Sequence, residues 1–284
     1  MKAFPFFPQC LQCLRPVRHL RVPAVLLRAA TLELAILAGH LLLYPAGLAP
    51  ERREAADPDP APGPNPQLPT PGADRPPAVL LHGFVDNRSV FVLLRRSLAR
   101  HGWRLLECLN YSPLTCDIRT AAELLGRHIE EICARTGRSE VDIVGHSLGG
   151  LIARYYVQRL GGDQRVRTLV SLGTPHSGTS VAPLASAHPI VRQMRPGSAL
   201  IEELRMPAPG CRTRFVSFWS DLDQLMVPVE TACIDHPDLI AQNVQVSGIG
   251  HLALPVHPAV AAGIRQALES SEAATGASGA VSVA

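Results

Sequence analysis

The chain has 284 residues, of which 46% are hydrophobic and 18% are charged, which is enough for one large α/β domain with an appended segment. Its formal net charge is only +3 and no basic stripe interleaved with aromatic residues occurs, so composition argues against a nucleic-acid partner. The 26 prolines and 22 glycines stay below the range of a low-complexity chain, so we expect any disorder to be local.

The first part of the chain, residues 1–50, is predicted to be a membrane anchor or a signal segment. Residues 1–28 hold five Lys or Arg residues and no acid, and residues 29–48 are apolar apart from interruptions that include Glu33 and His40. That length approaches the roughly 20 residues of a spanning helix. We favour an uncleaved anchor over a cleaved signal peptide, because the basic segment is long for a signal peptide. The remaining alternative is an amphipathic helix that packs on the body or lies in the membrane interface.

The charges on either side of this segment predict its orientation. Residues 51–57 hold three acids and two arginines, so the excess of Lys and Arg lies on the N-terminal side and places the N-terminus in the cytoplasm. We therefore expect a membrane-anchored protein whose remaining part is extracytoplasmic, or a secreted protein.

Residues 51–77 form a predicted linker. Nine prolines occur within residues 57–77 and large apolar side chains are almost missing there, so this stretch cannot offset the entropy of folding and is expected to stay extended. Residues 78–268 have the patterning of a compact catalytic domain. Residues 269–284 are mostly small and polar and are expected to form a flexible tail.

Short apolar runs alternate with segments of helical period across the compact domain. The expected strands lie at residues 78–81, 103–109, 141–144, 166–172, 215–219 and 244–249. The expected helices lie at residues 118–135 and 148–160. The first helix carries an apolar stripe formed by Ala122, Leu125, Ile129 and Ile132. This alternation predicts an α/β fold, with a mostly parallel, doubly wound sheet flanked by helices.

A G-x-S-x-G motif marks a candidate nucleophile. The sequence GHSLG, residues 145–149, lies at the junction between an expected strand and the helix that follows it. Such a sharp turn projects the Ser147 hydroxyl from the top of the sheet, and its glycines leave room for close backbone approach. A glycine-rich helix start with a capping serine is the alternative for the pentapeptide alone.

A serine nucleophile needs a base, and in this type of turn the order along the chain is nucleophile, acid, histidine. Three histidines lie far enough beyond Ser147, and of these only His251 directly follows an expected strand. We choose His251 as the base and interpret His236 and His257 as loop or surface histidines.

The acid is expected in the loop after the strand at residues 215–219, where Asp221 and Asp223 compete. Asp223 lies nearer the apolar turn at residues 225–227, which could bury a carboxylate against the imidazole, and we favour it. Asp221 better suits the cap of a turn just past a strand.

An oxyanion hole requires two backbone N–H donors directed at the developing negative charge. Leu148, the residue after the nucleophile, supplies the first donor. Phe84 is the expected second donor, because it follows the first strand and Gly83 permits the turn that directs its N–H inward. We interpret His82 as a structural residue of that loop.

Five segments of the chain resemble the bacterial triacylglycerol lipase and esterase group of the α/β-hydrolase fold. They are LLHGFVDNRSVF, DIVGHSLGGLIARYY, LVSLGTPHSGT, SDLDQLMVP and GIGHLAL, and they extend from near Val79 to Leu254 in the order that the family shows. The resemblance implies Ser147 as nucleophile, Asp223 as acid and His251 as base.

The resemblance also implies an oxyanion hole formed by Phe84 and Leu148. The segment at residues 173–179 looks like the lipase loop that shapes the acyl pocket, which makes His176 a candidate substrate-binding residue. A strand-ending turn without substrate contact is the alternative for this loop. We find no clear acidic pair for the calcium ion that some larger lipases bind, so we predict no metal and no cofactor.

Two further features are left open by the sequence. Residues 180–209 form a long insert with apolar side chains, which is either a mobile lid over an acyl channel or an ordinary packed helical excursion. Among the seven cysteines, the pairs Cys211 with Cys233 and Cys108 with Cys116 are candidate disulfides, and buried free thiols are the alternative.

The predicted activity is that of a serine carboxylic-ester hydrolase, a lipase or esterase that acts on acyl esters such as acylglycerols. The same residues would serve an acyltransferase, a phospholipase A-type enzyme or a polyester depolymerase. A tethered binding scaffold without catalysis is the alternative outside enzymes, and the complete set of candidate residues argues against it. The expected partners are a lipid or other acyl-ester substrate and a membrane.

Overall fold

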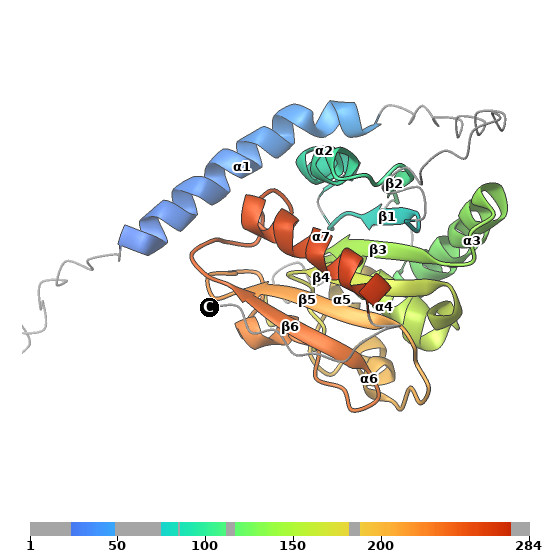
Figure 1. Ribbon diagram of the computed structural model, residues 1–284. Helices are drawn as coiled ribbons and strands as arrows, with labels where there is room; N and C mark the ends of the chain where they lie inside the picture. Colours follow the sequence, from blue (N-terminus) through green and yellow to red (C-terminus); the bar gives the residue numbers. More distant parts are fainter. Residues whose placement is uncertain (1–23, 49–74, 85, 112–116, 182–187, 274–284) are drawn as a thin grey trace, which may run out of the picture.

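The computed structural model describes residues 24–48, 75–84, 86–111, 117–181 and 188–273, drawn as ribbons in Figure 1. The central feature is a six-stranded sheet in the order β2-β1-β3-β4-β5-β6, in which every neighbouring pair is parallel. Its strands are β1 Ala78–Leu81, β2 Leu106–Leu109, β3 Val141–His146, β4 Val166–Leu172, β5 Arg214–Ser220 and β6 Ile240–Val246. The predicted α/β fold with a parallel sheet flanked by helices is confirmed.

Helices cover both faces of this sheet. The α-helices are α1 Ala24–Leu48, α2 Val92–Arg100, α3 Ile118–Thr136, α4 Leu148–Arg159, α5 Pro189–Gln193, α6 Ala199–Arg205 and α7 Pro258–Ala273. Short 3-10 helices are η1 Arg88–Phe91, η2 Gly162–Gln164 and η4 Val229–Ala232. One apolar cluster joins the sheet to α3, α4 and α6, and a second joins the opposite face to α2 and α7. The sheet is therefore doubly wound, as predicted.

Strand β1 shows why the sheet needs cover on both faces. All four of its residues are buried apolar residues, so no side of the strand can face water. Val79 and Leu81 belong to the cluster with α3 and α4, while Ala78 and Leu80 belong to the cluster with α2 and α7. This alternation follows from the two-residue period of a strand.

Helix α3 follows the predicted stripe closely. The Asp117 side chain caps its start by accepting the Thr120 N–H at 2.8 Å, and Gly137 ends it with a left-handed φ of 65°. The apolar stripe, here Leu125 and Ile129 among others, is buried against the sheet. Local signals at both ends and one apolar face thus define the helix.

The last strand is the main error of the sequence prediction. The prediction was residues 244–249, whereas β6 occupies Ile240–Val246 and is an edge strand, paired only with β5. Most of its side chains are exposed or half-buried, and Ile240 is 61% exposed. An edge strand of this kind lacks the continuous apolar run that identifies a central strand. The second strand, β2, is also shorter than predicted: it begins at Leu106, whereas the prediction began at residue 103.

Only residues 75–77 of the predicted linker and residues 269–273 of the predicted tail are among the described residues. Residues 51–74 of the predicted linker lie outside the described residues. Helix α7 continues to Ala273, so helical structure extends beyond residue 268, where the compact domain was expected to end. Residues 274–284 of the predicted tail lie outside the described residues.

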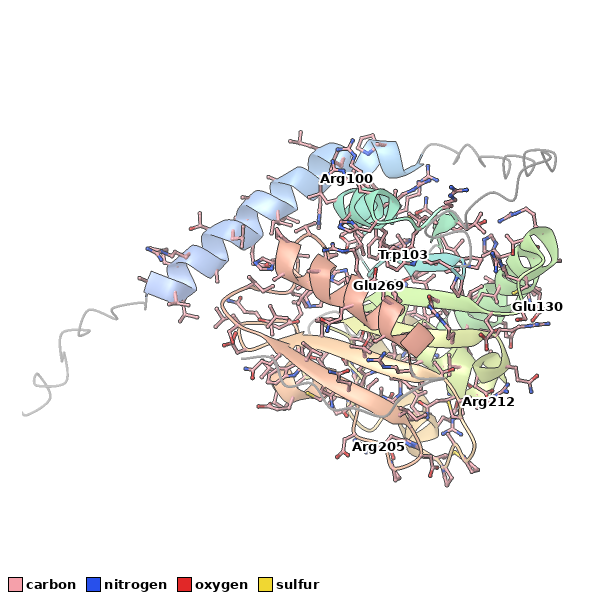
Figure 2. The ribbon with its side chains drawn as sticks, in the orientation of Figure 1. Arg100, Trp103, Glu130, Arg205, Arg212 and Glu269 are labelled. Atoms are coloured by element: carbon pink, nitrogen blue, oxygen red, sulfur yellow. The ribbon has the colours of Figure 1, made fainter. Side chains whose placement is uncertain are left out.

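The side chains of the described residues are drawn in Figure 2. Of the arginines labelled there, Arg100 lies at the end of the molecule near α1 and α2, whereas Arg205 and Arg212 lie at the opposite end. Arg75, at the start of the described body, places its guanidinium 3.9 Å from the centre of the Trp103 ring.

Candidate active site

Ser147 lies at the sharp turn between β3 and α4. Its backbone has φ 53° and ψ −119°, and it is the one non-glycine residue with a positive φ among those that the structure describes. Such a conformation costs an ordinary residue about 1–3 kcal/mol, so the surrounding structure must hold it in place. The Ser147 N–H donates to the Leu172 carbonyl at 2.8 Å, and Thr174 Oγ1 donates to the Ser147 carbonyl at 2.9 Å.

The glycines of the motif are required by space. A Cβ on Gly145 would lie 2.5 Å from the backbone nitrogen of Gly150, and a Cβ on Gly149 would lie 2.3 Å from the Leu81 carbonyl oxygen. Neither contact is possible without movement of the backbone. The close approach of the first turn of α4 to β1 therefore explains the spacing of the motif.

His251 and Asp223 form a buried pair beside this turn. His251 Nδ1 lies 2.7 Å from Asp223 Oδ2, and both side chains are almost inaccessible to solvent. Asp223 Oδ1 accepts the N–H groups of Leu225 and Met226 at 2.9 and 3.1 Å. The carboxylate is thereby fixed on one oxygen by the backbone and on the other by the imidazole.

The electrostatics favour the protonated form of His251. Burial alone would lower its pKa, but the charge of Asp223 and its hydrogen bond, the charge of Asp86 and the charge of Glu33 outweigh burial and raise the pKa above 6.5. A base whose imidazolium form is stabilised in this way can accept a proton from a neighbouring hydroxyl.

A second His–Asp pair lies next to the first, with the centres of the His146 and His251 rings 4.8 Å apart. His146 Nδ1 lies 3.3 Å from Asp86 Oδ2, and His146 Nε2 lies 3.4 Å from the His251 carbonyl oxygen. Burial alone would raise the pKa of Asp86, but the hydrogen bond and charge of His146, together with the charges of His40 and His251, lower it.

The sequence analysis missed this second pair. His146 stood inside the motif as an unassigned position, and Asp86 lies in the loop after β1 with no spacing rule that links it to the serine. The signal available in the sequence was the position of Asp86, close after the turn that holds Gly83. A Cβ on Gly83 would lie 3.1 Å from Asp86 Oδ2, which shows how tightly that turn approaches the site.

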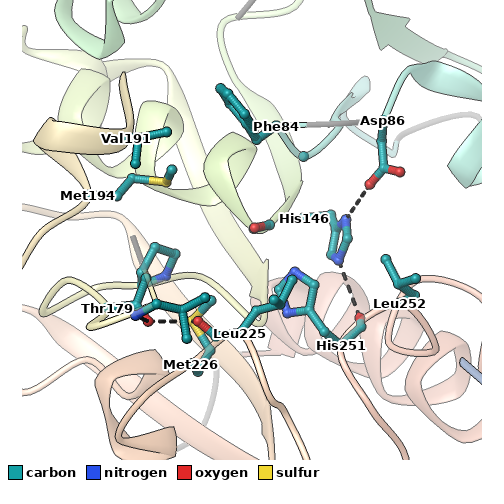
Figure 3. Close-up of a pocket in the computed structure, with 14 residues that line it drawn as sticks. Phe84, Asp86, His146, Thr179, Val191, Met194, Leu225, Met226, His251 and Leu252 are labelled. Carbon is teal, nitrogen blue, oxygen red and sulfur yellow. Dashed lines mark hydrogen bonds and ion pairs between the residues drawn. The ribbon is translucent and has the colours of Figure 1, made fainter. Parts of the chain in front are cut away.

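A cavity of about 280 Å³ opens beside these residues (Figure 3). Ser147 and His251 line it together with Phe84, Asp86 and His146. Its remaining walls are mostly apolar and come from Gly83, Pro175, Thr179, Val181, Val191, Met194, Leu225, Met226 and Leu252. A polar end beside an apolar chamber suits a ligand with one reactive group on an apolar chain.

The other sequence candidates take up clear positions. Leu148 is fully buried as the first residue of α4, directly after Ser147. Asp221 is exposed, and its Oδ1 accepts the Gly248 N–H at 3.1 Å, as a turn cap does. His236 Nε2 lies 3.1 Å from the Met206 carbonyl oxygen and does not line the cavity.

His176 lies in the interior and is not among the residues that line the cavity. Its Nε2 lies 2.8 Å from Ser171 Oγ, and its carbonyl accepts an N–H of Arg154 at 3.1 Å. Burial, with a smaller effect of the Arg154 charge, lowers the pKa of His176 well below its usual range. The structure therefore does not place His176, the candidate substrate-binding residue, at the cavity. The loop directs Pro175 and Thr179 to the cavity instead.

The insert at residues 180–209 contributes both packing and a cavity wall. Leu200, Ile201 and Leu204 of α6 are buried in the core, whereas Val191 of α5 and Met194 face the cavity. Residues 182–187 of the predicted lid lie outside the described residues.

The candidate disulfide between Cys211 and Cys233 is not formed, so the alternative of free thiols holds for this pair. Both are free thiols, and burial raises the pKa of each and keeps it protonated. Cys116, the expected partner of Cys108, lies outside the described residues. Within the described part of the chain, no group of three or more His, Cys, Asp or Glu side chains is arranged to hold a metal ion.

Comparison with known proteins extends this picture. The family model of the alpha/beta hydrolase fold matches residues 76–205. A triacylglycerol lipase of Pseudarthrobacter phenanthrenivorans is 30% identical over 121 residues, which cover 40% of this chain and 37% of the relative. A triacylglycerol lipase of Burkholderia plantarii is 30% identical over 121 residues, 40% of this chain and 33% of the relative. The chain thus spans about a third of the length of these curated relatives.

Solved structures agree on the fold. A Bacillus licheniformis lipase in its mature form superposes with a TM-score of 0.60 at 15% identity, over 72% of this chain and 96% of that one. Lipase B of Aspergillus fumigatus superposes with a TM-score of 0.62 at 17% identity, over 72% of this chain and 55% of that one. The family match over residues 76–205, the parallel sheet and these superpositions show that the chain has the alpha/beta-hydrolase fold, and over 121 residues it is similar to triacylglycerol lipases.

Proposed function

We propose that the protein is a serine carboxylic-ester hydrolase in which Ser147 is the nucleophile, His251 the base and Asp223 the residue that orients the base. The observation that carries this proposal is the strained Ser147 on the wall of the same cavity as His251, whose ring is held by Asp223. Strained backbone at a cavity is typical of functional sites, because the fold must use other interactions to maintain it.

The proposed reaction has two halves. Ser147 Oγ attacks the ester carbonyl carbon while His251 accepts its proton, and the N–H groups of Leu148 and Phe84 stabilise the negative oxygen of the tetrahedral intermediate. The ester C–O bond then breaks, and His251 returns the proton to the departing alcohol. In the second half, water attacks the acyl-enzyme, His251 accepts the proton from water, and the carboxylic acid leaves as Ser147 is restored.

The apolar walls of the cavity support an acyl chain as the buried part of the substrate. Val191 and Met194 on one side and Leu225 on another leave few polar partners for a charged or sugar-like group. We propose acyl esters such as acylglycerols as the substrate class. An alcohol acceptor in place of water would give an acyltransferase with the same residues.

Membrane attachment is part of the same proposal. Residues 24–47 form a helix that is long and apolar enough to cross a membrane. Its basic N-terminal flank supports membrane attachment with the catalytic domain outside the cytoplasm, and a secreted form is the alternative. Because α1 packs on the domain through Glu33, we propose attachment by a helix that lies in the membrane interface.

The direct test is hydrolysis of p-nitrophenyl esters of increasing chain length by the full-length protein in detergent. Ser147→Ala is expected to lower kcat by a factor on the order of 10⁶. Ser139→Ala, at an exposed serine away from the cavity, is the matched control and should keep full activity. A fluorophosphonate should label the wild type and not Ser147→Ala. A wild type that neither hydrolyses any ester nor accepts the phosphonate would support the non-catalytic scaffold instead.

A further inference from the structure

Glu33 is the one acidic residue of α1, and its carboxylate binds the turn that carries His251. Glu33 Oε2 accepts the N–H of Leu252 at 2.9 Å, and Oε1 accepts the N–H of Ala253 at 3.0 Å. A Cβ on Gly250 would lie 2.4 Å from Glu33 Cδ, so glycine there allows the carboxylate to approach. Both oxygens of the carboxylate are thereby used on the two residues that follow His251.

These hydrogen bonds fix His251 from a second direction. Asp223 holds the imidazole at Nδ1, whereas Glu33 holds the backbone just beyond it. Hydrogen bonds from backbone N–H groups to a carboxylate are among the stronger ones in proteins. Without Glu33, the turn would lose both partners and could shift, and the imidazole would shift with it.

Helix α1 also contacts the rim of the site farther along its length. His40 Nδ1 lies 3.7 Å from Asp86 Oδ1, and Asn87 Nδ2 donates to the Tyr44 carbonyl at 2.8 Å. Glu33 and Tyr44 are eleven residues apart, or about 16 Å of helix. Figure 1 shows α1 lying along the edge of the domain, where it contacts η1.

The opposite side of α1 carries exposed leucines. Leu27 is 63% exposed and Leu42 is 82% exposed. The helix therefore has a polar docking side formed around Glu33 and His40 and an apolar outer side. This arrangement corresponds to the alternative of a helix packed on the body, with an outer surface suited to the membrane interface.

A second cavity, of about 540 Å³, lies between α1 and the domain beside these contacts. Leu37 and Leu41 form part of its α1 wall, together with Glu33. It shares four lining residues with the first cavity: Asp86, Leu225, His251 and Leu252. Helix α1 therefore borders a space that adjoins the cavity lined by Ser147.

We propose that α1 is a working part of the active site, with Glu33 as a positioning residue that holds the His251 turn, so that ester hydrolysis depends on the docking of α1. This inference rests on the proposed function. It gives the single acid of an otherwise apolar helix a defined role, and an acidic residue within such a segment is rarely without one.

The titratable groups that face His251 come from several elements. They are Asp223 after β5, Asp86 after β1, His146 of β3 and Glu33 of α1. Loss of the Glu33 charge removes one of the groups that favour imidazolium. The acid limb of the pH–rate profile should therefore move to lower pH in any variant that lacks this carboxylate.

The experiment compares Glu33→Gln and Glu33→Ala with the wild type, as full-length proteins in the same detergent, with p-nitrophenyl butyrate as substrate. Glu33→Ala is expected to lower kcat by a factor on the order of 10², with KM nearly unchanged, because the base is misplaced while the apolar cavity stays intact. Glu33→Gln keeps one acceptor oxygen, so its kcat should lie between those of Glu33→Ala and the wild type. Leu42→Gln, which places the same side chain on the outer side of α1, is the matched control.

Hydrogen exchange at residues 250–254 provides a readout that does not depend on activity. The amides of Leu252 and Ala253 should exchange faster in Glu33→Gln than in Leu42→Gln. Unchanged exchange together with wild-type kcat and pH profile in Glu33→Gln would overturn the inference even if Glu33→Ala fails to fold. An inactive, unlabelled wild type would refute the proposed function, whereas an active enzyme indifferent to Glu33 would refute only this inference.

Discussion

Two His–Asp pairs lie side by side at the cavity that Ser147 lines, and they differ in how firmly each carboxylate is held. Asp223 lies 2.7 Å from the His251 ring and also accepts two backbone N–H groups. Asp86 lies 3.3 Å from the His146 ring and is shared with His40 at 3.7 Å. Proximity to the serine alone therefore does not identify a base; a carboxylate that orients one nitrogen of one imidazole does.

The largest difference between the two His–Asp pairs is expected when each imidazole is removed in turn. His251→Ala should lower kcat for p-nitrophenyl butyrate by a factor on the order of 10⁶, since the proposed nucleophile, Ser147, would lose its proposed base. His146→Ala should lower it far less, by about tenfold, because that ring only supports the neighbouring turn. A larger loss in His146→Ala than in His251→Ala would reverse the assignment of the base.

The next test removes each carboxylate charge. Asp223→Asn should reduce kcat by a factor on the order of 10⁴, because the amide no longer fixes the His251 tautomer or stabilises its imidazolium form. Asp86→Asn should be much milder. Steady-state kinetics of both variants, with circular dichroism to verify folding, distinguish the two; equal losses would mean that the pairs act together.

A smaller effect is expected on the pH profile. His251 must be neutral to act as a base, and its pKa is raised, so kcat/KM of the wild type should increase with pH through a value above 6.5. Asp86→Asn removes one negative charge that favours imidazolium, so this limb should move to lower pH. A limb that moves to higher pH, or stays in place, would show that Asp86 does not act on His251.

A third carboxylate, Asp142, is buried outside the site, and removal of its partner should have the smallest effect on kcat. Asp142 is fully buried and binds Arg167 through two hydrogen bonds of 3.0 and 2.6 Å; burial raises its pKa to about 6 despite the arginine. Arg167→Ala leaves this carboxylate without its cation and should cost about 3–5 kcal/mol of unfolding free energy. Urea unfolding measures that loss, and kcat at a temperature where the variant is folded should equal that of the wild type.

The success of sequence prediction follows from whether the determining interactions are local. The elbow at Ser147 and the helix α3 were predictable, because glycine spacing, a capping residue and an apolar stripe lie within a few residues of each other. Strand β6 was misplaced because an edge strand exposes most of its side chains and carries a weak pattern.

Long-range contacts account for what the sequence missed. Glu33 stood out only as an interruption in an apolar segment, and its partners, Leu252 and Ala253, lie more than two hundred residues away. His176 has the family's sequence context, yet its ring direction depends on Ser171 and on the packing of Arg154. No pattern within one segment encodes such pairings.

The positive φ of Ser147 lowers the stability of the fold at the same position that the proposed chemistry requires. Glycine adopts this conformation without strain, so Ser147→Gly would relieve about 1–3 kcal/mol of backbone strain while it removes the proposed nucleophile. A library of variants selected for thermal resistance alone would therefore enrich inactive sequences at this residue. Any effort to make the protein more robust has to hold position 147 constant and look for gains elsewhere.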